Sequence, residues 1–229
     1  MKMSNTQRLY ALTALVVAGS VGASACASMN KKEEGAVIGA AAGGAVGGVI
    51  GNQTGSTARG AIIGAVVGGT AGAIIGHQMD QQAKELSQNI PGATVARVGE
   101  GIAVTFASGL LFAFDSDQIL PAAGTNLTEL AKSLQKYPES QLLIVGHTDN
   151  VGDASYNQRL SERRSNSAAT YLAAQSVART RLAATGKGES EPIATNETDA
   201  GRQQNRRVEV AIYASEAYRQ RLLKSNTGD

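Results

Sequence analysis

Glycine recurs at every fourth position in two segments of this chain, residues 35–53 and 60–78, and the second segment repeats the first. A spacing of four places these glycines on one helical face, where a second backbone can approach closely. Because each glycine costs an isolated helix roughly 1 kcal/mol relative to alanine, such helices need a packing partner. The sequence therefore predicts a glycine-zipper helical hairpin over residues 35–78, with the polar connection Asn52–Arg59 between its two helices.

Two environments remain open for this hairpin. Each apolar stretch is about 17 residues long, roughly 25 Å at 1.5 Å per residue, which is the short limit for crossing a bilayer. The hairpin can therefore insert into a membrane, or it can pack against copies of itself or lie on a membrane surface. It is not a nucleotide-binding loop, because no Gly-Lys-Ser/Thr follows the glycines.

Residues 1–25 have the pattern of a secretory signal peptide. Lys2 and Arg8 supply the positive charge, an apolar core follows at residues 9–17, and the small residues 23–25 suit a cleavage site. Removal of this segment takes both positive charges away, so the formal net charge of +2 falls to about zero. No nucleic-acid partner is expected, because the mature chain lacks a global basic field.

Cys26, the only cysteine, comes directly after the cleavage site, so no internal disulfide can form. Its position resembles the lipobox of bacterial lipoproteins, which implies acylation of the thiol and of the new amino terminus. Ala-Ser-Ala also suits ordinary signal peptidase. Several acyl chains would anchor the chain stably, with residues 26–34 as a linker. Ala27 stands where lipoproteins retained in the inner membrane often have aspartate, so the sequence resembles that of lipoproteins sorted to the outer membrane. We therefore expect a lipid-anchored protein whose globular domain lies in the periplasm.

The remaining sequence alternates between helix and strand patterns. Apolar residues at spacings of three and four predict helices that start at Pro121 and near Asp153–Tyr156. Helices that alternate with strands suit an α/β sandwich of one sheet and one helical layer. The other expected elements are a connecting helix at 80–89, strands at 94–98, 102–106, 111–114, 142–145, 184–188 and 206–214, a polar loop at 191–202, and a polar tail from 216 that is a short helix or disordered.

Charged residues at three places in this pattern suit a ligand with charges of both signs. Asp149 follows a strand, where it is either a turn residue or a ligand. Arg164 continues the inward helical stripe of Leu160, where a charge needs a partner, whereas Arg163 points about 100° away toward solvent. Arg206 begins the last strand and can reach the same cleft. A structural salt bridge to Asp149 is the alternative role for Arg164 and Arg206.

The motifs Gly146-His147-Thr148-Asp149, 159–164 and 205–210, in this order, resemble those of the OmpA-like peptidoglycan-binding domain across residues 105–214. The resemblance implies a βαβαβ-type two-layer sandwich. In that family the aspartate of the first motif and the arginine fifteen residues later hold meso-diaminopimelate of the stem peptide, and Asp149 and Arg164 meet this spacing. By the same resemblance the further contacts are Asn157, Arg206, Thr148 and, more weakly, Asp117.

With the lipobox, the zipper, a connecting helix and hairpin at 79–104 and a tail at 215–229, the layout is similar to YiaD-type outer-membrane lipoproteins. This resemblance implies a non-enzymatic tether between outer membrane and peptidoglycan. An oligomeric zipper scaffold or pore and a cell-wall hydrolase are the alternatives. No cofactor is expected, no serine nucleophile motif is present, and with only two histidines no metal site can be assembled from sequence spacing. His147 is expected to pack at its strand end, and Phe114 in the core.

Overall fold

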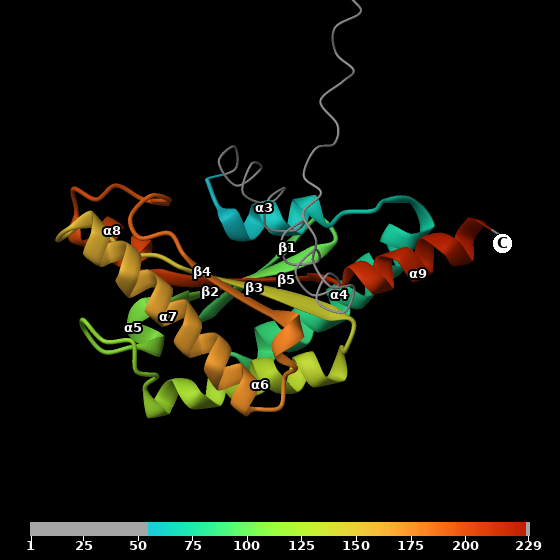
Figure 1. Ribbon diagram of the computed structural model, residues 1–229, viewed down its shortest axis with the longest axis horizontal. Coiled ribbons are helices and arrows are strands. Elements are labelled where there is room, and N and C mark those ends of the chain that lie inside the picture. Colours follow the sequence, from blue (N-terminus) through green and yellow to red (C-terminus); the bar gives the residue numbers. More distant parts are fainter. Residues whose placement is uncertain (1–54, 228–229) are drawn as a thin grey trace, which may run out of the picture. The chain divides into compact units, whose positions relative to one another are not determined.

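A computed structural model describes residues 55–227, so the signal peptide, Cys26 and the first arm of the zipper lie outside the described residues. The centre is a five-stranded sheet in the order β1-β2-β5-β3-β4 (Figure 1). Neighbouring strands run antiparallel except β3 and β4, which are parallel. The strands are β1 Ala93–Val98, β2 Gly101–Ala107, β3 Ser140–Gly146, β4 Leu182–Gly186 and β5 Arg207–Ala214.

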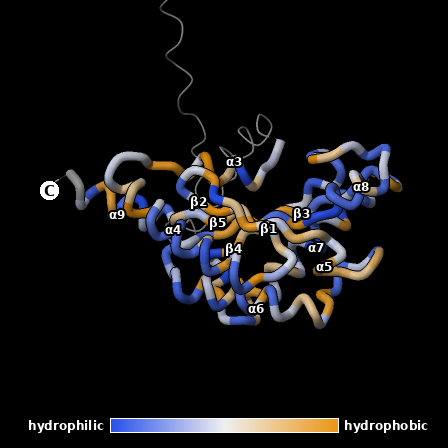
Figure 2. The backbone as a smooth tube through the Cα atoms, turned by 180° about the vertical axis from the view of Figure 1, so that it is seen from behind, coloured by the Kyte–Doolittle hydropathy of each residue, from blue (hydrophilic) through white to orange (hydrophobic). Residues whose placement is uncertain are grey.

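Three long helices bury their apolar stripes against one face of this sheet: α4 (Gly69–Asn89), α6 (Pro121–Lys136) and α7 (Ala154–Ala174). The facing side chains alternate along the strands, as a half-buried strand requires. Figure 2 shows the most hydrophobic stretches of the chain in the central strands. The core includes Met79, Leu86, Leu127, Leu130, Leu134, Leu172, Ile102, Val104, Ile144, Val210 and Ile212.

The opposite face of the sheet is covered by a shorter helix, α3 (Thr57–Gly64), as Figure 1 shows. Ala58, Ala61 and Ile62 of α3 are buried against this face. Small side chains on the strands allow the helix to approach closely; the facing residues are Ala103, Leu143, Val145 and Ala211. The predicted α/β fold is confirmed, and α3 is an addition to the single helical layer that the sequence suggests.

The second glycine segment is split between these two helices, so the prediction of one continuous helix over 60–78 is wrong. The α3 helix ends at Gly64 and α4 begins at Gly69, after Gly68 and Gly69 adopt φ of 70° and 61°. The Glu100 carboxylate accepts hydrogen bonds from the backbone N–H groups of Val67 at 3.0 Å and Gly68 at 2.8 Å. This contact fixes the break. No helix among the described residues is long and apolar enough to cross a membrane.

The segment predicted as a strand at 111–114 has a different structure. A short helix, α5 (Ser108–Leu111), precedes an open loop that is closed by a single bridge between Phe112 and Ile119. Phe112 is buried, but Phe114 is 99% exposed, so its predicted place in the core is wrong. Asp115, the next residue in this loop, has a positive φ of 54°, which is uncommon for a residue other than glycine.

The connection β3–α7–β4 brings the functional motifs together. Because β3 and β4 are parallel, α7 must cross over the sheet between them, and its first turn lies beside the end of β3. The predicted polar loop at 191–202 contains the start of α8 (Asp199–Asn205), which leads into β5. The tail forms α9 (Glu216–Thr227), one of the two states expected for it.

Candidate functional site

A pocket of about 250 Å³ opens where the end of β3, the first turns of α7 and the start of β5 meet. Five of the six side chains predicted to bind the ligand line it, namely Thr148, Asp149, Asn157, Arg164 and Arg206. The loop after α5 supplies Phe114 and Asp115, and α8 supplies Arg202. Segments far apart in the sequence therefore meet in one cavity with both charge signs on its wall.

Asp149 is buried at the base of this pocket, with 7% of its surface exposed. One carboxylate oxygen accepts a hydrogen bond from the backbone N–H of Val151 at 3.1 Å, and the other pairs with Arg206. The Asn157 amide donates to the carbonyl oxygens of Asp149 and Val151 and, at 2.8 Å, to Glu189. Pairing of Asp149 with an arginine, the structural alternative raised above, is thus found for Arg206.

Arg164 is buried as well, with 5% of its surface exposed, and none of the ion pairs within residues 55–227 involves it. Its Nε donates to the Ser116 carbonyl at 2.9 Å, and its guanidinium carbon lies 5.3 Å from the centre of the Phe112 ring. Burial lowers the pKa of Arg164, because desolvation disfavours the charged form. The pocket therefore presents a buried cation whose terminal nitrogens can receive an anion.

Two buried polar side chains follow β3, His147 and Thr148, and neither forms a side-chain hydrogen bond within residues 55–227. The Thr148 hydroxyl has no hydrogen-bond partner among the described residues and belongs to the pocket wall. His147 is 1% exposed and packs at the strand end, as predicted. Burial, followed by the charge of Arg207, lowers the pKa of His147 to about 3, while Glu209 acts in the opposite direction.

His147 is expected to make the fold sensitive to mild acid. In the unfolded chain the pKa of His147 is about 6.5, so below that pH His147 is protonated in the unfolded state and stays neutral in the folded state. Stability should therefore fall by about 2 kcal/mol between pH 7 and pH 5 from this group alone. Chemical denaturation of His147→Leu at both pH values should show a smaller loss than the parent, and equal losses would contradict the assignment.

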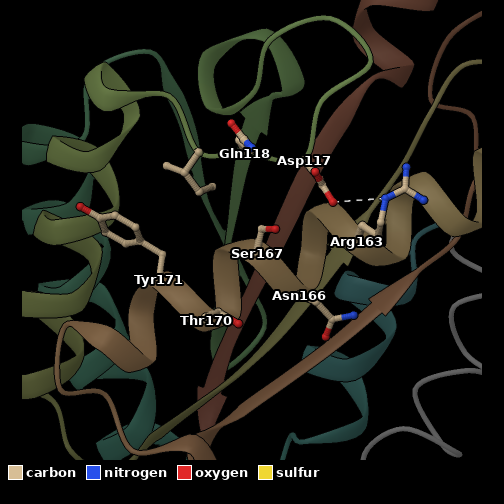
Figure 3. Close-up of a pocket in the computed structure, with 8 residues that line it drawn as sticks. Asp117, Gln118, Arg163, Asn166, Ser167, Thr170 and Tyr171 are labelled. Carbon is tan, nitrogen blue, oxygen red and sulfur yellow. Dashed lines mark ion pairs between the residues drawn. The ribbon is translucent and has the colours of Figure 1, made fainter.

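Asp117, the sixth predicted residue, lies outside this pocket. It pairs with Arg163 at 3.2 Å on the rim of a neighbouring groove (Figure 3). Arg163 is half-exposed, as its position on α7 predicts, and its guanidinium carbon lies 5.9 Å from the centre of the Tyr156 ring. The structure thus brings five of the predicted residues together in one pocket and places Asp117 in the neighbouring groove.

The sequence reasoning missed Phe114, Tyr156 and Arg202, which also line the pocket. Tyr156 could have been found, because it precedes Leu160 and Arg164 at the same spacing of four on α7. Its hydroxyl donates to Asp115 across the pocket mouth. No comparable signal marks Arg202, whose position depends on the turn of the chain through α8.

Comparison with known proteins identifies the family of this domain. Residues 111–206 match the model of the OmpA family, and residues 2–80 match that of the YMGG-like Gly-zipper. The probable lipoprotein YiaD of Escherichia coli K12 is 35% identical over 136 residues, which cover 58% of this chain and 62% of that protein. The match therefore spans less than two thirds of this relative.

A second relative is matched over more of its length. The outer-membrane lipoprotein YfiB of Pseudomonas aeruginosa is 37% identical over 115 residues, which cover 50% of this chain and 68% of that protein. Among solved structures, the cell wall anchor of the T6SS from Pseudomonas aeruginosa superposes with a TM-score of 0.50 and 30% identity, over 63% of this chain and 97% of that one. The chain therefore belongs to the OmpA family.

Proposed function

We propose that this protein binds peptidoglycan without covalent chemistry, through the pocket of Asp149 and Arg164, and so tethers the outer membrane to the cell wall. The observation that carries the proposal is the buried Arg164, which has no ion-pair partner in the described part of the chain. A desolvated cation is costly unless an anion joins it. Membership in the OmpA family and the similarity to a cell wall anchor support the same reading.

The expected ligand follows from the hydrogen-bonding groups that the site leaves unused. Arg164 uses Nε for Ser116, which leaves its two terminal nitrogens for a carboxylate. Asp149 lies on the same wall and can accept from an ammonium group, since its partner Arg206 is 41% exposed in its side chain and can move. The far end of meso-diaminopimelate carries an ammonium and a carboxylate on one carbon. The unpartnered Thr148 hydroxyl offers a further hydrogen bond.

The membrane end of the tether is assigned to segments outside the described residues. Acyl groups on Cys26 would hold the chain in the outer membrane, and the first glycine segment, residues 35–53, would lie next to that anchor. Association of copies through this segment would make the tether multivalent. The relatives named as lipoproteins support this arrangement.

Removal of the Arg164 charge should weaken wall binding roughly a hundredfold, because truncating a buried charged partner costs about 2–5 kcal/mol. Full-length protein in detergent is sedimented with purified sacculi over a concentration series. Arg164→Gln and Asp149→Asn should both lose binding, and free meso-diaminopimelate should compete with the parent protein.

Arg159→Gln is the matched control, because Arg159 lies on the same helix, is exposed and forms its one side-chain hydrogen bond within residues 55–227 with Ser155. It should sediment like the parent. Thermal unfolding of each variant verifies that the fold is intact. If folded Arg164→Gln and Asp149→Asn sediment with the wall as the parent does, the proposed site is wrong.

A further inference from the structure

An open groove of about 600 Å³ lies beside the pocket, on the other side of the segment 115–117. Figure 3 shows its two walls: Asp117 and Gln118 on the loop after α5, and a row of side chains on α7. The row consists of Arg163, Asn166, Ser167, Thr170 and Tyr171.

The groove continues the pocket along α7. Arg163 and Arg164 are consecutive, and one faces each cavity. The dividing segment is held from both sides, because Arg164 donates to the Ser116 carbonyl and Arg163 pairs with Asp117. From Arg164 to Thr170 the helix advances about 9 Å at 1.5 Å per residue. A chain that leaves the pocket across this segment therefore has a surface of two or three extended residues' length to follow, at about 3.3 Å each.

The chemistry of the groove differs from that of the pocket. Its two charged groups, Asp117 and Arg163, neutralise each other, so the groove does not select an ion. The hydroxyls of Ser167 and Thr170 and the amide of Gln118 form no hydrogen bonds within residues 55–227 and point toward open space. Tyr171 is fixed by its hydroxyl to the Gly124 carbonyl. A rigid ring beside free hydroxyl and amide groups suits an uncharged chain rich in amides.

We propose that this groove is a second subsite, which binds amide groups of peptidoglycan next to the residue held by Arg164. The inference rests on the proposed function of the pocket. Two sources on the same polymer have this chemistry: the peptide bonds of the stem and the N-acetyl groups of the sugars. The pocket supplies charge recognition, and the groove makes the polymer bind more tightly than its isolated end group.

Three ligands test this: free meso-diaminopimelate, the tripeptide L-Ala-D-Glu-meso-diaminopimelate, and the disaccharide tripeptide. Full-length protein in detergent is titrated with each by calorimetry. The parent should bind at least one of the longer ligands about tenfold more tightly than diaminopimelate, as two or three added hydrogen bonds imply. A gain already present with the tripeptide assigns the groove to the stem, and a gain only with the disaccharide assigns it to the sugars.

The double variant Ser167→Ala/Thr170→Val removes both hydroxyls with little change of volume on an exposed helix face, and Ser167→Trp fills the groove. Both should abolish the gain for the longer ligand while affinity for diaminopimelate stays unchanged. Ser190→Ala, an exposed hydroxyl outside both cavities, is the control. Unchanged binding of the longer ligands by both groove variants overturns the subsite. If the parent protein does not bind diaminopimelate, the proposed function of the pocket is overturned instead.

Discussion

Replacement of Glu209 by leucine is expected to lower the free energy of unfolding by about 3–5 kcal/mol, because it leaves Arg207 charged and buried without its partner. Arg207 is 1% exposed, and its Nε donates to the Glu209 carboxylate at 2.7 Å. The second oxygen of Glu209 accepts from the Ser56 hydroxyl at 2.6 Å. The pair therefore lies between β5 and the beginning of α3, away from water.

The double variant Arg207→Met/Glu209→Leu should recover most of this loss, since an apolar pair of similar volume is often as stable as a buried ion pair. Glu129→Leu is the matched control, because the Glu129–Lys132 pair is exposed and should contribute at most about 1 kcal/mol. Urea denaturation of the parent and of the three variants gives the comparison. A double variant as unstable as Glu209→Leu would show that the cost does not come from an uncompensated charge.

Arg207 illustrates what a strand pattern can and cannot predict. Val208, Val210 and Ile212 alternate in the sequence and are all buried on the core face of β5. The same alternation puts Arg207 on the opposite face, which a two-layer sandwich would leave to solvent. Arg207 is buried only because α3 covers that face, and the sequence of β5 does not predict the presence of this helix.

Arg164 and Asp149 could be predicted from spacing because they lie in regular elements or close behind one, whereas Asn157 and Thr148 were predicted only from the family resemblance. Arg164 was assigned to the inside of α7 from a spacing of four, and it is buried there. Asp149 follows a strand whose end is fixed by apolar pattern. Asp117 lies in an irregular loop, where the direction of a side chain depends on tertiary contacts such as its pair with Arg163. Its place in the groove could not be derived from spacing.

The break in the second glycine segment could not be predicted from the sequence for a similar reason. A glycine every fourth residue is compatible with a straight helix and also with a positive φ at Gly68 and Gly69. What decides between them is Glu100, more than thirty residues later, which accepts from the two N–H groups exposed at the break. Local pattern gave the helical tendency, and the long-range hydrogen bonds decided where the helix stops.

Gly146→Ala is expected to destabilise the fold by about 3 kcal/mol, near the upper end for an overpacked interior. A Cβ at this position would press against the carbonyl oxygen of Ser161 and lie 2.9 Å from its carbonyl carbon. Both are backbone atoms of α7, so no flexible side chain can move aside. Gly109→Ala is the control, because a Cβ there meets nothing within 4 Å, and α5 should accept it without loss.

This substitution should also affect binding, because Gly146 directly precedes the segment that carries Thr148 and Asp149, while Ser161 precedes Arg164 by less than one helical turn. Any shift that relieves the overlap separates β3 from α7 and so changes the distance between the two charges of the pocket. Thermal unfolding measures the first effect, and sacculus sedimentation well below the unfolding temperature measures the second. Folded Gly146→Ala that binds the wall like Gly109→Ala would show that the close approach of β3 and α7 serves stability alone.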